Sequence, residues 1–282
     1  MTNNGTFTIG GDLTVNRIGY GTMQIVGPGY WGEPRDRSEA IAVLRRAVEL
    51  GVNFIDTADA YGPFVAEDLI REALHPYRDD LVIATKGGVL RTGPDEWPPL
   101  GRPEYLRQAL EMSLRRLGVD HVDLYQLHRI DPVVPLEDSL GELARMQKEG
   151  KIRHIGLSEV SVAEIEAARP VADVVSVQNM YNLSARGAED VLEHTRTAGM
   201  AFIPWFPMAT GELARPGGVL AAAADRHGVT PAQLALSWLL HRAPNVIPIP
   251  GTSRIAHLEE NVAAATVSLS PAEVAELTAL VR

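Results

Sequence analysis

Residues 38–86 read SEAIAVLRRAVELGVNFIDTADAYGPFVAEDLIREALHPYRDDLVIATK, and this segment contains the unit from which we expect the whole chain to be built. Two amphipathic parts, Ser38–Leu50 and Ala66–Leu74, carry apolar residues at helical spacing. Each is followed by a short apolar run, Asn53–Thr57 and then Leu81–Lys86, which predicts a buried strand. Helices that alternate with strands in this way are typical of a parallel sheet.

The alternation extends over the chain, with eight apolar runs in total. They are Arg17–Met23, Asn53–Thr57, Leu81–Lys86, Val122–His128, His154–Ser158, Val174–Asn179, Ala201–Phe206 and Asn245–Pro250. The first and the last begin seven repeats apart, at roughly 33 residues per unit, which is a normal length for a strand and its helix. Eight such units in 282 residues predict a single α/β domain over residues 1–282, a closed (β/α)8 TIM barrel.

The main alternative is an open, doubly wound sheet of the Rossmann type. Its fingerprint would be G-x-G-x-x-G after the first strand, but Gly19-Tyr-Gly21-Thr-Met-Gln24 lacks the third glycine. Before the barrel, Thr6–Ile9 and Asp12–Val15 flank Gly10-Gly11 and predict a β-hairpin that caps the N-terminal end.

Three further segments bear on access to the catalytic face of the barrel. Two long loops, Gly87–Arg102 and Pro207–Gly218, follow strand C-termini, where barrels place their active sites, and we expect them to order around ligands. The last predicted helix, Pro271–Val281, runs to the end of the sequence. We therefore expect an open pocket without a long covering C-terminal loop.

The composition excludes several classes of protein. The chain has no Cys, so thiolate chemistry and disulfides are absent, and no metal-ligand cluster is evident in the sequence. With 26 Lys plus Arg against 36 Asp plus Glu, the formal net charge is 26 − 36 = −10, which argues against a nucleic-acid partner. No signal peptide or membrane-spanning run is found, and these features predict a cytoplasmic protein without a membrane partner.

Polar side chains stand at the ends of three consecutive predicted strands. Asp56, Lys86 and His128 close these strands, and Tyr61 follows Asp56 by five residues. Each one alone is more often a cap, a solvated charge or a packing residue, but in a barrel all four would face one mouth. A phenol beside an ammonium, with a carboxylate and a neutral imidazole, is a general-acid site suited to reducing a carbonyl.

These residues lie in segments that resemble the signatures of the aldo-keto reductase family. The segments are residues 51–62 (GVNFIDTADAYG), 83–86 (IATK), 123–128 (DLYQLH), 150–158 (GKIRHIGLS), 177–182 (VQNMYN) and 249–254 (IPGTSR). The resemblance covers essentially the whole chain. It implies a (β/α)8 barrel, usually monomeric, that reduces aldehydes or ketones to alcohols by hydride transfer from NADPH, with NADH as a weaker possibility.

The resemblance also implies roles for individual residues. Tyr61 is the expected proton donor, Lys86 lowers its pKa, Asp56 pairs with Lys86, and His128 orients the carbonyl. The expected cofactor contacts are Ser158 and Gln178 for the carboxamide, Trp205 for the nicotinamide ring, Gly251, Thr252, Ser253 and Arg254 for the 2′-phosphate, and Glu260 and Asn261 for adenine. A helix start with a hydroxyl and a guanidinium suits a phosphate.

Three residues depart from the family pattern. Glu159 stands where an Asn is common, Phe206 where a small polar residue is common, and His257 where an Arg often reaches the cofactor. The expected substrate pocket is mostly apolar and combines Met23, Tyr30, Trp31, Trp97 and Arg129, which suits hydrophobic or aromatic aldehydes.

Two other functions stay open at this stage. A regulatory or redox-sensing subunit can share this fold and bind NADPH with little turnover, as the channel β subunits do. A Schiff-base lyase would use Lys86 as its nucleophile, but a neighbouring carboxylate raises the pKa of an amine, whereas a nucleophilic amine needs a lowered pKa.

Overall fold

The computed structural model describes residues 5–215 and 217–281, without the side chain of residue 210. Residues 1–4, which belong to the segment searched for a signal peptide, lie outside the described part. Residue 216, within the second predicted long loop, also lies outside it. Among the described residues, a search for helices that could span a membrane finds none.

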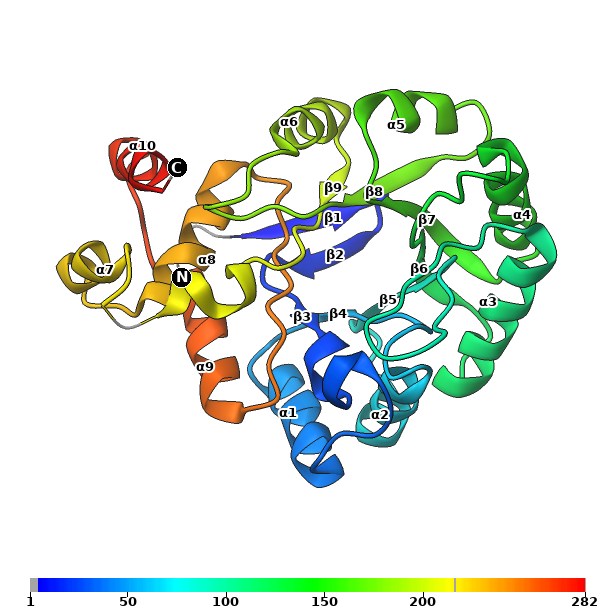
Figure 1. Cartoon of the computed structure of the whole chain (residues 1–282), viewed down its shortest axis with the longest axis horizontal. Helices are drawn as coiled ribbons and strands as arrows, with labels where there is room; N and C mark the ends of the chain where they lie inside the picture. The colour runs from blue at the N-terminus through cyan, green and yellow to red at the C-terminus, as the bar shows by residue number, and fades with distance from the viewer. Residues whose placement is uncertain (1–4, 216, 282) are drawn as a thin grey trace.

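Seven parallel strands form one curled sheet in chain order, as Figure 1 shows. They are β3 (Tyr20–Gly21), β4 (Phe54–Asp56), β5 (Val82–Gly87), β6 (Val122–Leu127), β7 (Ile152–Ser158), β8 (Val174–Gln178) and β9 (Ala201–Phe202). Residues 245–250 take the place of the eighth strand. Val246 forms a parallel bridge with Phe202 on one side, and the Gly19 amide donates to the Pro248 carbonyl at 3.0 Å on the other. The sheet is thereby closed, and the predicted (β/α)8 barrel is confirmed.

The helices surround the barrel. They are α1 (Arg37–Glu49), α2 (Val65–Leu74), α3 (Pro103–Leu117), α4 (Leu136–Lys148), α5 (Val162–Ala168), α6 (Glu189–Ala198), α7 (Ala221–His227), α8 (Pro231–Arg242), α9 (Ile255–Ala263) and α10 (Pro271–Leu280). Short 3-10 turns cover Thr22–Ile25, Pro28–Tyr30, Ala209–Ala214 and Ala264–Thr266. Helices α5, α8 and α10 each begin with a capping box, in which a hydroxyl and a Glu or Gln side chain satisfy exposed backbone amides.

The N-terminal hairpin closes one end of the barrel. Strands β1 (Thr6–Ile9) and β2 (Leu13–Asn16) pair antiparallel, and their inward side chains include Ile9 and Val15. These two pack in one buried cluster with Phe54 and Val82, the first residues of β4 and β5. The hairpin therefore covers the N-terminal end, as predicted, and leaves the C-terminal ends of the strands free for a site.

Two predicted strands are shorter in the structure because of proline. The seventh run was predicted to reach Phe206, but β9 ends at Phe202, two residues before Pro204. The eighth run contains Pro248 and Pro250, which have no amide hydrogen to donate to a neighbouring strand. Arg17 anchors this segment instead, because its buried guanidinium donates to the carbonyls of Leu240, Ala243 and Val246.

Candidate active site

The site is centred on Lys86, which lies on β5 and is fully buried. Its ammonium donates to Asp56 Oδ1 at 2.6 Å, to the Thr57 carbonyl at 2.8 Å and to the Tyr61 hydroxyl at 3.2 Å. Burial opposes the charge, but Asp56 and Tyr61 beside it raise the pKa of Lys86 above its ordinary value. The amine is therefore a fixed cation at neutral pH, and this state does not suit a Schiff-base nucleophile.

Asp56 is held by a buried amide network within the barrel. Its Oδ2 accepts from Gln178 Nε2 at 2.8 Å and from Gln126 Nε2 at 3.1 Å. Gln126 was missed by sequence reasoning. The signal available was a polar residue inside an otherwise apolar run on β6. With Lys86, the two amides give the carboxylate three donors, which fixes its orientation.

Tyr61 points its hydroxyl at this ion pair. Its side chain is only 5% exposed. Burial raises the pKa of the Tyr61 phenol above its ordinary value, and the Lys86 cation offsets this only in part. The net direction differs from the lowering expected from Lys86 alone, because desolvation of the phenolate is the larger effect. The phenol consequently stays protonated at neutral pH.

His128 stands beside Tyr61, with ring centroids 6.0 Å apart and planes at 83°. Burial, with the cations Lys86, Arg129 and Arg91, holds the pKa of His128 well below its ordinary value. Its Nδ1 is buried and has no partner among the described residues. The imidazole is thus neutral at physiological pH. It can accept a hydrogen bond from a ligand or donate one to it.

A loop closes the mouth of the site on the side of Tyr61. Trp97 contacts the rings of Tyr30, Tyr61 and His128. The guanidinium carbon of Arg91 lies over the Trp97 ring, 3.6 Å from its centroid. The Arg91 guanidinium also donates to five backbone carbonyls, which belong to Gly29, Tyr30, Ala60, Gly93 and Glu96. Sequence reasoning missed Arg91, which fixes the wall that carries Trp97.

The opposite wall carries Trp205, which follows β9. Its indole Nε1 donates to Glu159 Oε1 at 2.6 Å, and the same oxygen accepts from the Met180 amide at 2.6 Å. Glu159 adopts a left-handed backbone, with φ of 55°. The carboxylate of Glu159 is therefore engaged with Trp205 rather than aimed into the cavity, and it holds the indole in place.

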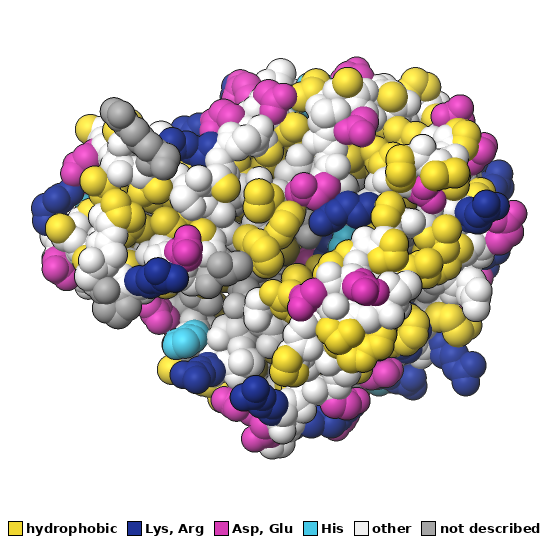
Figure 2. Space-filling view, viewed as in Figure 1, with side chains coloured by type: hydrophobic (Ala, Val, Ile, Leu, Met, Phe, Trp, Pro, Cys, Tyr) yellow, Lys and Arg dark blue, Asp and Glu magenta, His cyan; other side chains and the backbone are white. Residues whose placement is uncertain are grey.

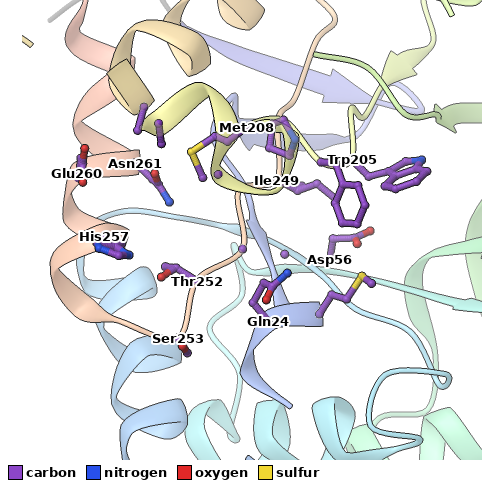
Figure 3. Close-up of a pocket in the computed structure, with 18 of the residues that line it drawn as sticks. Gln24, Asp56, Trp205, Met208, Ile249, Thr252, Ser253, His257, Glu260 and Asn261 are labelled. Atoms are coloured by element: carbon purple, nitrogen blue, oxygen red, sulfur yellow. The ribbon is translucent and has the colours of Figure 1, made fainter. Parts of the chain in front are cut away.

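A cavity of about 1420 Å³ joins these residues to helix α9. Figure 3 shows Asp56 and Trp205 at one side of it and His257, Glu260 and Asn261 on α9 at the other. The lining includes the following predicted residues: Met23, Tyr30, Asp56, Tyr61, Trp97, His128, Arg129, Ser158, Gln178, Trp205, Gly251, Thr252, Ser253, Glu260 and Asn261.

Three predicted site residues do not line this cavity. Lys86 lies beneath Tyr61, and Trp31 packs toward Arg91, at 5.6 Å from its guanidinium carbon. Arg254 is exposed where α9 begins. The lining also contains residues that were not predicted, among them Gln24, Pro207, Met208 and Ile249. Pro207 and Met208 belong to the second long loop, whose position after a strand was the available signal.

The α9 end of the cavity has features that suit a polar ligand. The Tyr20 hydroxyl donates to the Thr252 carbonyl at 2.5 Å and ties the start of α9 to β3. The Asn261 side chain is 2% exposed, and its Nδ2 has no partner among the described residues. A buried donor of this kind needs an acceptor, and an adenine or ribose atom could supply it.

The chain resembles known proteins over nearly its whole length. A family model described as the aldo/keto reductase family matches residues 17–282. An uncharacterized oxidoreductase of Schizosaccharomyces pombe is 55% identical over 267 residues, which are 95% of this chain and 87% of that protein. Pyridoxine 4-dehydrogenase of Escherichia coli is 46% identical over 271 residues, 94% of each. The crystal structure of an aldo-keto reductase from Klebsiella pneumoniae in complex with NADPH matches with a TM-score of 0.84 at 29% identity, covering 99% of this chain and 95% of that one.

Proposed function

The chain belongs to the aldo/keto reductase family and is an NADP(H)-dependent oxidoreductase, and from that premise we propose that it reduces aldehydes and ketones with Tyr61 as general acid. The observation that carries the proposal is the buried contact between the Tyr61 hydroxyl and Lys86 at 3.2 Å, in a cavity that neutral His128 also lines. Together these groups can receive a carbonyl oxygen and give it a proton.

Each residue has a distinct part in the proposed reaction. Tyr61 holds the proton that the carbonyl oxygen takes. Lys86 stabilises the phenolate left behind, since its ammonium already lies against the Tyr61 oxygen. Asp56 keeps Lys86 charged and in position. His128, which is neutral and lines the cavity beside Tyr61, orients the carbonyl oxygen there.

The cavity extends from these residues to α9, and we propose that it holds a dinucleotide. Ser158, Gln178 and Trp205 would hold the nicotinamide end. Gln178 Nε2 is committed to Asp56, so its carbonyl oxygen is the group left for the carboxamide. Residues 251–254, with Glu260 and Asn261, would hold the adenosine end. When bound, NADPH supplies the hydride.

The lining favours aromatic aldehydes as substrates. Tyr30 and Trp97 line the cavity near Tyr61, and stacking on such rings favours flat substrates. The Escherichia coli relative is a pyridoxine 4-dehydrogenase by name, which makes pyridoxal a rational first substrate. We propose an aromatic aldehyde of this kind rather than a small aliphatic one.

The test is a panel of aromatic and aliphatic aldehydes, assayed with NADPH and with NADH by loss of nicotinamide absorbance. We expect turnover with NADPH and the highest kcat/KM for aromatic aldehydes. Tyr61→Phe should lower kcat by about 100-fold or more while NADPH binding, followed by protein fluorescence, changes little. Tyr77→Phe is the matched control, because its hydroxyl donates to the distant Leu117 carbonyl.

Two results would contradict this proposal. Near wild-type turnover in Tyr61→Phe would exclude Tyr61 as the acid. NADPH binding without turnover of any aldehyde or ketone in the panel would favour a redox-sensing subunit over an enzyme.

A further inference from the structure

Arg129 presents a fixed cation to the catalytic cavity. It follows His128 directly in the chain, lines the cavity and is half-buried. Its Nη1 donates to the His128 carbonyl at 2.6 Å and to Ser158 Oγ at 3.1 Å. Its Nε and Nη2 make no hydrogen bond to any residue that the structure describes. One nitrogen therefore anchors the guanidinium, and the other two are left for a ligand.

The other cations near Tyr61 have no such capacity. Lys86 is buried and spends its donors on Asp56, Thr57 and Tyr61. Arg91 is saturated by backbone carbonyls and stacked on Trp97. Among the described residues, Arg129 is thus the cation on the cavity wall near Tyr61 that has N–H groups without a hydrogen-bond acceptor.

No carboxylate of the described chain forms an ion pair with Arg129. The acidic side chain that influences it is Glu159, which raises the pKa of Arg129 while burial, the larger effect, lowers it. Glu159 Oε1 is occupied by Trp205 and Met180, and Glu159 does not line the cavity. Figure 2 shows basic, acidic and histidine side chains gathered at the hollow in the middle of this face. The charge of Arg129 is therefore only partly compensated within the protein.

We propose that Arg129 is a specificity residue that binds a carboxylate on the carbonyl substrate, so that the preferred substrates are aromatic aldehydes bearing a carboxylate. This inference rests on the proposed reductase function. A guanidinium edge with two adjacent N–H groups matches a carboxylate in a two-pronged arrangement. The aldehyde group would lie at Tyr61 and His128, and the carboxylate would extend along the wall to Arg129.

The energetic consequence is mainly in binding. The carboxylate does not react, so its contact with Arg129 is equally strong in the ground state and in the transition state. Such a contact lowers KM and leaves kcat nearly unchanged. A hydrogen-bonded charge pair in a half-buried site corresponds to roughly a 10- to 100-fold effect.

The experiment compares 3- and 4-carboxybenzaldehyde with their methyl esters at saturating NADPH. The measured quantity is the ratio of kcat/KM for acid and ester, in the wild type, Arg129→Lys and Arg129→Met. We expect at least one acid to exceed its ester by about tenfold or more in the wild type, through KM. Arg129→Met should abolish that preference, and Arg129→Lys should keep part of it because an ammonium cannot form the paired contact.

Arg78→Met is the matched control, because Arg78 pairs with Asp80 on the surface and lies outside the cavity lining. It should leave the acid-to-ester ratio unchanged. If Arg129→Met does not fold, the test rests on Arg129→Lys. Its acid-to-ester ratio of kcat/KM should then be lower than that of the wild type but still favour the acid.

The outcomes separate this inference from the function on which it rests. Reduction of both esters without preference for either acid overturns the role of Arg129 and keeps the reductase. An acid preference that persists in both Arg129 variants also overturns it. Failure to reduce acids and esters alike removes the proposed function, and the inference with it.

Discussion

The buried ion pair between Asp56 and Lys86 makes a quantitative prediction about stability. Asp56→Asn preserves the shape of the side chain but removes its charge, and Lys86 stays fully buried with an uncompensated ammonium. The new amide also presents N–H groups where Asp56 now accepts from Gln126 or Lys86. Breaking one side of a buried pair costs about 3–5 kcal/mol of unfolding free energy, a large share of a typical 5–15 kcal/mol.

The free energy of unfolding that Asp56→Asn loses should depend on pH, and the shift in the pKa of Lys86 determines the direction. In the wild type, Asp56 holds the pKa of Lys86 above its ordinary value of 10.5, against the effect of burial. From neutral pH up to that value the pair therefore stabilises the fold, and the contribution of Lys86 is lost as pH rises through its raised pKa. In Asp56→Asn, only Tyr61 still opposes the effect of burial, and the pKa of Lys86 falls. The deficit of the variant should then be largest at neutral pH and shrink as pH rises toward 10.

Urea denaturation followed by circular dichroism, at pH 7 and at pH 9.5, measures both effects. Asp80→Asn is the control, because Asp80 pairs with Arg78 at the surface, and it should stay within about 0.5 kcal/mol of wild type. The double variant Asp56→Asn/Lys86→Met should be more stable than Asp56→Asn alone. A deficit below about 1 kcal/mol at pH 7, or one that grows with pH, would refute the reasoning.

Three further expectations concern the loop, the imidazole and the cofactor. Arg91→Met frees the wall that carries Trp97, so KM for aromatic aldehydes should rise more than KM for propanal; equal increases would contradict this. Burial and nearby cations lower the pKa of His128, so protonation of His128 should not reduce kcat/KM between pH 8 and pH 6. A fall in kcat/KM near pH 6.5 that is absent in His128→Gln would contradict this expectation. Arg254→Ala should weaken NADPH binding, measured by fluorescence titration, by about tenfold while NADH changes less, and equal losses would remove the phosphate role.

The sequence predicted the elements that depend on periodicity. Alternating helices and strands placed Asp56, Lys86 and His128 at the C-terminal ends of three neighbouring strands, and the structure brings Tyr61 to the same point. Capping boxes were equally visible, since each is a local pattern of four residues.

Features that depend on contacts far apart in the sequence were not predictable. Arg91 looks like a solvated charge in a Gly- and Pro-rich loop, and only the fold brings carbonyls from Gly29 and Ala60 to it. Gln126 is oriented inward by its register on β6, and its partner Asp56 is 70 residues away. The sign of the Tyr61 pKa shift also needs the degree of burial, which residue types alone do not give.

The raised pKa of Tyr61 changes how its partner Lys86 is understood. If Lys86 mainly served to lower the pKa of the free phenol, its ammonium would stabilise a phenolate before any substrate reacts. In the proposed reaction, burial instead keeps the proton on Tyr61 until a carbonyl oxygen becomes basic enough to take it. The phenolate would then form 3.2 Å from an ammonium that Asp56 and the Thr57 carbonyl already hold in place. The attraction between these charges is strongest in the same dry surroundings that disfavour the phenolate beforehand. Burial and the ion pair therefore act together, because one retains the proton and the other stabilises the charge left by its transfer.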